Sequence, residues 1–239
     1  MGGVKTPLKI FVVGCGRSGT NWVGEILATH PDIVGHLEQE PAYGWVRAMA
    51  IEPALTASLM PQLLEYYREA HVALVPKHFA DKSHSSLWLA EPIAAHFPEA
   101  RFIAVRRAVA PTVASMLKHR GVLSSIFEWD RAPRLCRYLN VTDVEAYRAL
   151  TLEERCAKRV VGSLAEIARL ERILAGRFHA LDYEALQASP CARLSSVAKF
   201  LGVRDAFGTP TPRADSLEKW RLELSDEQQQ RIAAIERAR

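Results

Sequence analysis

The sequence predicts a three-layer α/β fold, in which a central parallel β-sheet carries helices on both faces. Short β-branched or aromatic runs alternate with amphipathic helical segments along the 239 residues, and this alternation is typical of a parallel sheet. The first run ends in a glycine-rich turn that leads into a helix, which is the arrangement of a P-loop-like phosphate-binding loop. No repeat or linker-like stretch divides the chain, so residues 1–239 are expected to form a single domain.

Apolar periodicity and turn residues predict the elements of the first half. In chain order these are a strand at Lys9–Val13, a helix at Asn21–Thr29, a short extended segment within His30–Pro41, a helix at Pro53–His71 and a strand edge at Val72–Pro76. The polar stretch KHFADKSHSS that follows predicts a loop.

The second half is expected to continue the alternation, with one interruption. The expected elements are a helix at Leu87–His96, a strand at Ala100–Arg107, a helix from Val109 to a stop at Gly121, a helix from the capping box Thr151-x-x-Glu154 to about Leu174, a strand at RFHALDYEAL, a helix at Ser189–Leu201 and a terminal helix capped at Ser225. The irregular stretch 123–150, rich in Trp, Arg and Pro, predicts a lid or substrate-facing insertion. Its candidates to face an acidic or aromatic substrate are Trp129, Arg131, Arg134, Arg137 and Tyr138.

Composition excludes several classes of function. The four cysteines are widely scattered without a Cys-x-x-Cys pair, which argues against disulfides or a zinc site and predicts a reduced, cytoplasmic compartment. No stretch approaches the ~20 apolar residues of a membrane span. The net charge of +4 suits an anionic small ligand, and without a basic stripe interleaved with aromatics no nucleic-acid partner is expected.

The turn after the first strand fits two phosphate-binding patterns. Gly14-x-Gly16-x-x-Gly19 satisfies the dinucleotide fingerprint, and Glu38 and Glu40 follow roughly 20 residues on. An NAD(P)-binding oxidoreductase is therefore one alternative. Its weakness is that the turn carries polar side chains, whereas a dinucleotide turn mostly uses bare backbone.

The second pattern is the P-loop of nucleoside-triphosphate enzymes. Gly14-x-x-x-x-Gly19 matches it, but Thr20-Asn21 replaces the lysine and the Mg²⁺-binding Ser or Thr. A kinase or GTPase is therefore not expected, nor is a metal requirement. The pattern that remains is a cradle of backbone N–H groups, in which Arg17 supplies the positive charge that the lysine provides in a P-loop.

This turn resembles the 5′-phosphosulfate loop of sulfotransferases that use 3′-phosphoadenylyl sulfate (PAPS). The matching residues are Arg17-Ser18-Gly19-Thr20-Asn21-Trp22. The resemblance implies that Arg17 through Asn21 hold the 5′-phosphosulfate, and that Trp22 stacks on the adenine. It also implies PAPS as co-substrate and adenosine 3′,5′-bisphosphate (PAP) as product.

A second stretch resembles the 3′-phosphate motif of the same family, a strand ending in Arg with a Ser eight positions later. FIAVRRAVAPTVASML supplies Arg107 and Ser115 at this spacing, whereas Arg106 would give a spacing of nine. A guanidinium clamps an anion bidentately, and the hydroxyl adds a donor. The Asp-Pro that usually follows the Arg is Ala108-Val109 here, which departs from the family pattern.

Two later segments extend the resemblance to about Lys9–Leu224. LDYEALQASPCARLSSVAKFLGV is similar to the family's strand-end Tyr-Glu-Asp-Leu and the helix after it, which implies that Tyr183 lies near the adenine. SLEKWRLELS resembles a stretch that closes over the nucleotide. There Lys219 or Arg221 is the candidate to reach the 3′-phosphate.

Sulfuryl transfer needs positive groups on the sulfonate and a base for the acceptor hydroxyl or amine. Arg17 and Lys82 are the expected charge stabilisers. Glu40, with Glu38 beside it, resembles the base of carbohydrate and protein-tyrosine sulfotransferases, and Lys82-Ser83-His84 resembles the Lys-Thr-His of cytosolic ones. Glu40 is favoured slightly over His84. The acceptor is expected to be a small molecule or carbohydrate, and a non-catalytic nucleotide-binding protein is a further alternative.

Overall fold

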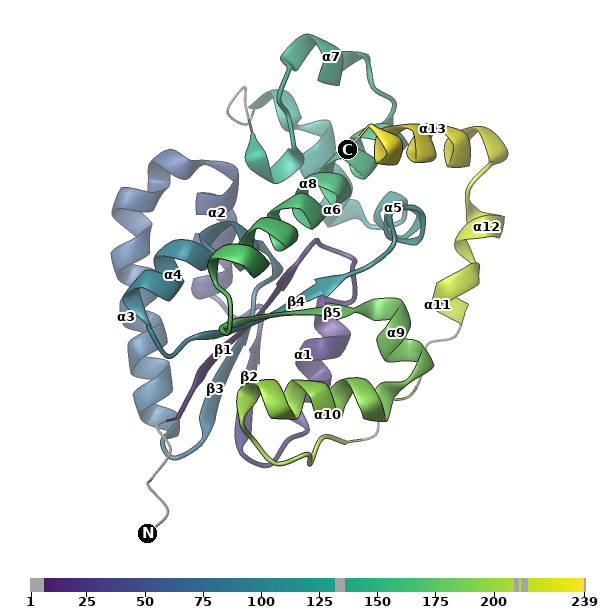
Figure 1. Cartoon of the computed structure of the whole chain (residues 1–239). Coiled ribbons are helices and arrows are strands. Elements are labelled where there is room, and N and C mark those ends of the chain that lie inside the picture. The colour runs from purple at the N-terminus through teal and green to yellow at the C-terminus, as the bar shows by residue number, and fades with distance from the viewer. Residues whose placement is uncertain (1–6, 132–135, 209–210, 212–214, 239) are drawn as a thin grey trace.

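In the part of the chain that the structure describes, five parallel strands form one sheet covered by helices on both faces (Figure 1). The computed structural model describes residues 7–131, 136–208, 211 and 215–238. Across the sheet the strands are β2 (Ile33–Leu37), β3 (His78–Lys82), β1 (Lys9–Gly14), β4 (Arg101–Arg106) and β5 (Phe178–Asp182). This confirms the predicted three-layer α/β fold with a central parallel sheet.

The helices alternate with these strands along the chain. They are α1 (Thr20–Ala28), α2 (Ala42–Ile51), α3 (Thr56–Leu74), α4 (Ala90–His96), α5 (Val109–Leu117), α6 (Arg120–Phe127), α7 (Val144–Ala149), α8 (Leu152–Ile173), α9 (Tyr183–Ala188), α10 (Pro190–Leu201), α11 (Asp215–Glu218), α12 (Trp220–Glu223) and α13 (Asp226–Arg237). Among the described residues, no helix has the length and apolar character needed to cross a bilayer.

The central strand β1 is buried on both faces, as its continuous apolar run predicts. Phe11 and Val13 pack with α2, α3, α4 and α8, whereas Ile10 and Val12 pack with α1, α9 and α10. Successive side chains of a strand point to opposite faces, so this one strand anchors both helical layers. Its carboxyl end, where the phosphate turn begins, is thereby held from both sides.

One predicted strand was wrong. Residues 72–74 end α3, and the strand is β3 instead, inside the segment predicted as a polar loop. Phe79 and Ala80 supply the buried apolar pair, one in each core. The neighbouring Asp81 is also buried and accepts hydrogen bonds from Tyr67 Oη (3.2 Å) and Ser83 Oγ (3.3 Å). Burial raises the pKa of Asp81 to about 7. The charged residues of β3 made this segment resemble a polar loop in the sequence, because the residues that pair with them lie elsewhere in the fold.

The stretch predicted as a lid is largely packed against the helical layer. It contains the end of α6, two 3₁₀ turns and α7, and Trp129 packs edge-on to Tyr147 at 5.1 Å between ring centres. Arg131 pairs with Glu128 and Arg137 pairs with Glu166. Arg134 lies outside the described residues. Helix α2, which lies between β2 and α3 along the chain, was not predicted.

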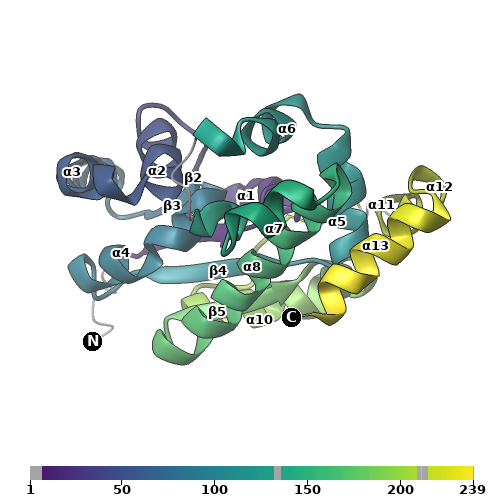
Figure 2. The same ribbon diagram turned by 90° about the horizontal axis from the view of Figure 1, so that it is seen from above.

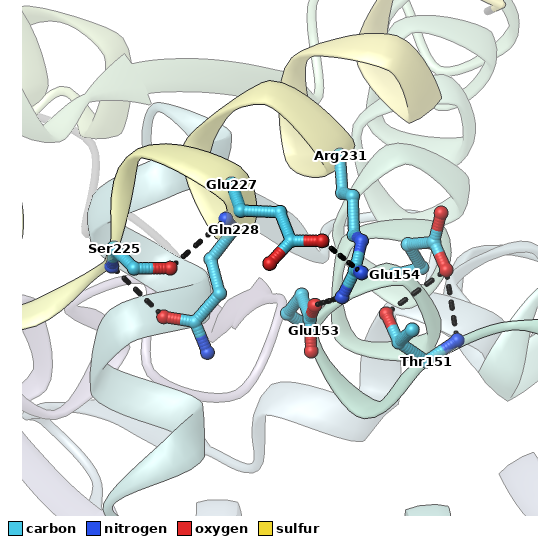
Figure 3. Close-up of polar contacts among 7 residues, drawn as sticks. All are labelled: Thr151, Glu153, Glu154, Ser225, Glu227, Gln228 and Arg231. Atoms are coloured by element: carbon cyan, nitrogen blue, oxygen red, sulfur yellow. Dashed lines mark hydrogen bonds and ion pairs between the residues drawn. The ribbon is translucent and has the colours of Figure 1, made fainter.

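The last helix is fastened to α8, as Figure 3 shows. Ser225 Oγ accepts the Gln228 amide (3.2 Å) and Gln228 Oε1 accepts the Ser225 amide (3.0 Å), which forms a capping box. Arg231 then donates to the buried Glu153 of α8 at 2.9 Å. In Figure 2, α13 lies along α5 and α8, the helices that carry Ser115 and Arg159.

The Ser225 cap generates a stability prediction. Ser225→Ala should lower the free energy of unfolding by about 1 kcal/mol, because the helix loses an acceptor for an orphan amide. In a chain of this length that corresponds to a melting temperature lower by roughly 2–4 °C in calorimetry. Gln230→Ala, an exposed position on the same helix, is the control and should change the free energy by less than about 0.5 kcal/mol. Equal melting temperatures for both variants would contradict the prediction.

Candidate active site

The turn between β1 and α1 depends on Gly19. This residue has φ 102°, and a β-carbon there would lie 2.4 Å from the ring of Tyr183. Only glycine combines a left-handed backbone with such a close approach. Helix α1 begins directly after it without a side-chain cap, so its first amides keep the positive end of the helix open to an anion.

One cavity, here called the Arg107 pocket, lies on the α1 side of this turn. The residues that line it are Arg17, Gly19, Thr20, Asn21, Trp22, Glu25, Arg107, Ser115, Tyr183, Ser216 and Lys219. All the predicted nucleotide-binding residues except Ser18 are in this set. Ser18 is buried beneath the turn, and its Oγ has no hydrogen-bond partner within the described structure.

The guanidinium of Arg107 is positioned by three contacts. It donates to the carbonyl oxygens of Arg17 (3.2 Å) and Ser216 (2.6 Å), and it lies 4.5 Å from the centre of the Tyr183 ring. Its Nε is buried and has no hydrogen-bond partner within the described residues, so this donor is unpaired. Nearby, Arg17 Nε donates to Ser115 Oγ at 3.2 Å. Burial lowers the pKa of Arg107, and an anionic ligand would offset that effect.

The neighbouring arginine has a different role. Arg106, the last residue of β4, makes a two-pronged contact with Asp182 of β5 at 2.8 and 3.2 Å and does not line the pocket. The sequence spacing that favours Arg107 over Arg106 therefore agrees with the side chain that faces the cavity. Of the two C-terminal candidates, Lys219 lines the pocket, whereas Arg221 pairs with Glu218 at 2.6 Å.

A second cavity, here called the His84 pocket, lies on the other side of the turn. The residues that line it are Gly16, Arg17, Thr20, Asn21, Glu38, Tyr43, Arg47, Lys82, His84, His119, Gly121, Val122, Ser124, Ser125, Tyr138 and Arg159. Arg17, Thr20 and Asn21 belong to both linings. The phosphate turn is thus the wall between the two cavities.

Three titratable groups meet inside the His84 pocket. Glu38 Oε1 accepts from Lys82 Nζ at 2.5 Å and from His84 Nδ1 at 3.0 Å. Burial acts to raise the pKa of Glu38, but the hydrogen bonds from His84 and Lys82 outweigh it and lower the pKa to about 2. Burial lowers the pKa of Lys82, and the contact with Glu38 offsets part of that effect.

The same hydrogen bond sets the state of His84. An ionised carboxylate only accepts, so Nδ1 carries the proton and Nε2 of the neutral ring is a free lone pair. Burial lowers the pKa of His84, despite the raising effect of Glu38, so the ring is neutral near pH 7. Nε2 lies against Gly16, where a β-carbon would come within 3.3 Å of it.

Glu40 is not brought into this group. Its side chain is exposed, Oε2 accepts the Gly44 amide at 3.1 Å within the first turn of α2, and it does not line the His84 pocket. Its neighbour Glu38, which was named only as an adjacent carboxylate, occupies the central position. Because Glu38 directly follows the end of β2, strand assignment alone was a usable signal for it.

Other lining residues had no local signal in the sequence. Arg159 and Tyr43 come from the middle of α8 and the start of α2, and both reach the pocket only through the packing of these helices. Tyr138, one of the residues expected in the lid, lines this pocket. Burial raises the pKa of Tyr43 to about 12, so its hydroxyl remains protonated.

The strand order argues against the dinucleotide alternative. Here β3 lies between β1 and β2, whereas a dinucleotide-binding sheet has its second strand beside the first. Glu38, the acidic residue at the expected distance, is engaged by Lys82 and His84. The glycine spacing by itself therefore did not identify the ligand.

Comparisons with known proteins agree with this picture. A family model described as the sulfotransferase family matches residues 7–206. No curated protein matches the sequence. The structure is similar to the sulfotransferase domain from the curacin biosynthetic pathway, with 16% identity, a TM-score of 0.65, and 95% of this chain and 96% of that chain covered.

Two further solved structures share the fold. The sulfotransferase domain of the Synechococcus PCC 7002 olefin synthase has 18% identity and a TM-score of 0.61, with 98% of this chain and 95% of that chain covered. Mouse sulfotransferase SULT7A1, complexed with PAP, has 16% identity and a TM-score of 0.55, with 95% and 82% covered. At these identities the structures show a common fold, and the match of the family model over most of the chain shows the family. The protein is a member of the sulfotransferase family.

Proposed function

We propose that this sulfotransferase moves the sulfuryl group of PAPS to a hydroxyl or amine of a small-molecule or carbohydrate acceptor and releases PAP. The observation that carries the proposal is the shared wall: Arg17, Thr20 and Asn21 line both the Arg107 pocket and the His84 pocket. A donor in the first pocket and an acceptor in the second would meet at these residues. The mouse sulfotransferase complexed with PAP supports the choice of donor.

The Arg107 pocket suits a nucleotide with phosphates at both ends of its ribose. We assign the 5′-phosphosulfate to the amides of Arg17–Asn21 and the 3′-phosphate to Arg107, Ser115 and Lys219. The unpartnered Nε of Arg107 and the uncapped start of α1 are the features that fit these anions. Trp22 and Tyr183, whose ring centres are 5.6 Å apart, supply the aromatic surface for adenine.

The transfer step is a displacement at sulfur. The acceptor oxygen or nitrogen forms a bond to sulfur, the bond from sulfur to the 5′-phosphate oxygen breaks, and the acceptor proton passes to a base. Arg17 and Lys82 would stabilise the negative charge that develops on the sulfonate and on the leaving oxygen. The ion pair with Glu38 holds the Lys82 ammonium in place at this point.

For the base we propose His84. Glu38 accepts from Nδ1 and so leaves Nε2 free to take the acceptor proton, and it stabilises the imidazolium that results. The low pKa of Glu38 makes this carboxylate a poor base in itself. Glu40, the residue favoured by sequence resemblance, is kept as the competing candidate.

The reduced cytoplasmic compartment inferred from the scattered cysteines also stays a prediction.

The first prediction concerns the nucleotide. Arg107→Gln should weaken PAP binding about 10- to 100-fold in calorimetric titration, because charge-assisted hydrogen bonds to the 3′-phosphate are lost. Arg106→Gln is the matched control. It removes a neighbouring guanidinium that is engaged by Asp182, and PAP affinity should stay within about threefold of the parent. If Arg106→Gln has the larger effect, the assignment is incorrect.

The second prediction separates the candidate bases. His84→Gln should lower turnover at least about 100-fold in an assay with labelled PAPS and an acceptor panel, while PAP affinity is retained. Glu40→Gln is measured in parallel. Loss of turnover in Glu40→Gln but not in His84→Gln would make Glu40 the base. PAP binding without transfer to any acceptor would favour the non-catalytic alternative.

The third prediction is a pH profile. Because burial lowers the pKa of His84, kcat/KM should be level above about pH 6.5 and fall as the pH drops through the lowered pKa, where Nε2 becomes protonated. His84→Gln should lose this acid limb along with most of its activity. If the fall of kcat/KM at low pH persists unchanged in the residual activity of His84→Gln, that fall belongs to a different titrating group.

A further inference from the structure

Arg159 is a buried cation in the His84 pocket that the proposed reaction does not use. It is 2% exposed, and its guanidinium carbon lies 4.3 Å from the centre of the Tyr138 ring. Nη2 donates to the Tyr138 hydroxyl, and Nη1 is buried without a hydrogen-bond partner among the described residues. Within the same described ranges, no carboxylate forms an ion pair with it.

The Nη2 end of the Arg159 guanidinium, which also donates to Tyr138, faces the proposed reaction centre. A β-carbon placed on Gly16 would lie 3.2 Å from Arg159 Nη2 and 3.3 Å from His84 Nε2. The guanidinium and the proposed base therefore border the same small space above the turn. An acceptor whose hydroxyl reached Nε2 would bring its neighbouring atoms close to Arg159.

The other charges of the pocket leave Arg159 uncompensated. Glu38 is the acidic residue among those that line the pocket, and it already accepts hydrogen bonds from Lys82 and His84. Arg17 is assigned to the donor. Arg47, at the exposed edge of the pocket, donates to Ser125 Oγ at 3.0 Å and thus adds positive charge without a carboxylate partner in the described structure.

A buried guanidinium with a free N–H group is costly unless a ligand supplies the missing acceptor. Removing a charge from water carries a large desolvation cost, and a carboxylate in a fork-like contact with arginine recovers much of that cost. Tyr43, Val122 and Tyr138 add apolar surface, and the cavity holds about 280 Å³. These features suit a small acceptor with an apolar body and one anionic group.

We infer that the acceptor is a small hydroxylated or aminated carboxylic acid, whose carboxylate binds Arg159 while its nucleophile faces His84. This inference rests on the proposed function, because it names the substrate class of the same site. It makes Arg159 the residue that selects acidic over neutral acceptors. Arg47 would attract the same charge at the mouth of the pocket.

The test compares acids with their matched amides. A panel of hydroxyphenyl carboxylic acids of increasing chain length, each paired with its primary amide, is titrated calorimetrically into the full chain with and without PAP. The best acid should bind at least about tenfold tighter than its amide. Equal affinities within every pair, or no binding of either member across the panel, would overturn the inference.

Variants assign the preference to one side chain. Arg159→Gln should reduce the acid-to-amide ratio to less than about twofold, and Arg159→Lys, which keeps the charge, should retain part of it. The control is Arg155→Gln, one turn earlier on α8, where the arginine lies over the Trp129 and Tyr147 rings outside the pocket. That control should keep the parent ratio. An unchanged ratio in Arg159→Gln would contradict the inference.

Two further measurements separate this inference from the proposed function. Failure of the parent chain to bind PAP would reject the donor assignment, whereas the comparison made without PAP still reports on acid preference. The affinities of PAPS and PAP are then compared in Arg159→Gln. If PAPS weakens relative to PAP while the acid preference persists, Arg159 serves the sulfuryl group of the donor and the inference is overturned.

Discussion

All five strands of the sheet end at the same edge, and a candidate functional residue lies at or shortly after each of these ends. Arg17 follows β1, Glu38 follows β2, Lys82 closes β3, Arg107 follows β4 and Tyr183 follows β5. Parallel pairing requires this convergence, because strands that run in one direction present their carboxyl ends together. The site therefore exists only when the complete strand order is formed.

Because the strand ends converge, several positively charged side chains lie near one another. Some of them are paired with a carboxylate, and others are not. Lys82 is neutralised by Glu38, which also orients His84. Arg106 is neutralised by Asp182. Arg107 and Arg159 instead keep buried N–H groups without partners among the described residues. Buried polar groups in folded proteins are nearly always paired, so the unpaired donors of two side chains that line the pockets support the proposal that ligands bind there.

The turn between the two pockets shows how packing enforces this arrangement. The close contact between Gly19 and the Tyr183 ring fixes the turn against the end of β5, and the same ring supports the guanidinium of Arg107. Behind the site, α8 carries Arg159 and is itself anchored by α13 through Glu153 and Arg231. Elements far apart in sequence thus hold the walls of the His84 pocket.

The sequence by itself determined the α/β class and the capping box at Thr151, and it predicted the phosphate turn, the Arg107–Ser115 pair and the cap at Ser225, because each depends on local spacing or a short periodic pattern. It did not identify β3, whose charged residues become acceptable in a buried strand only after Tyr67 and Glu38 supply their partners. It favoured Glu40, whereas the fold brings Glu38 to His84, and nothing in the local sequence connects Arg159 with Gly16. Charge compensation and helix packing join residues that are distant along the chain, and only the tertiary structure could decide those pairings.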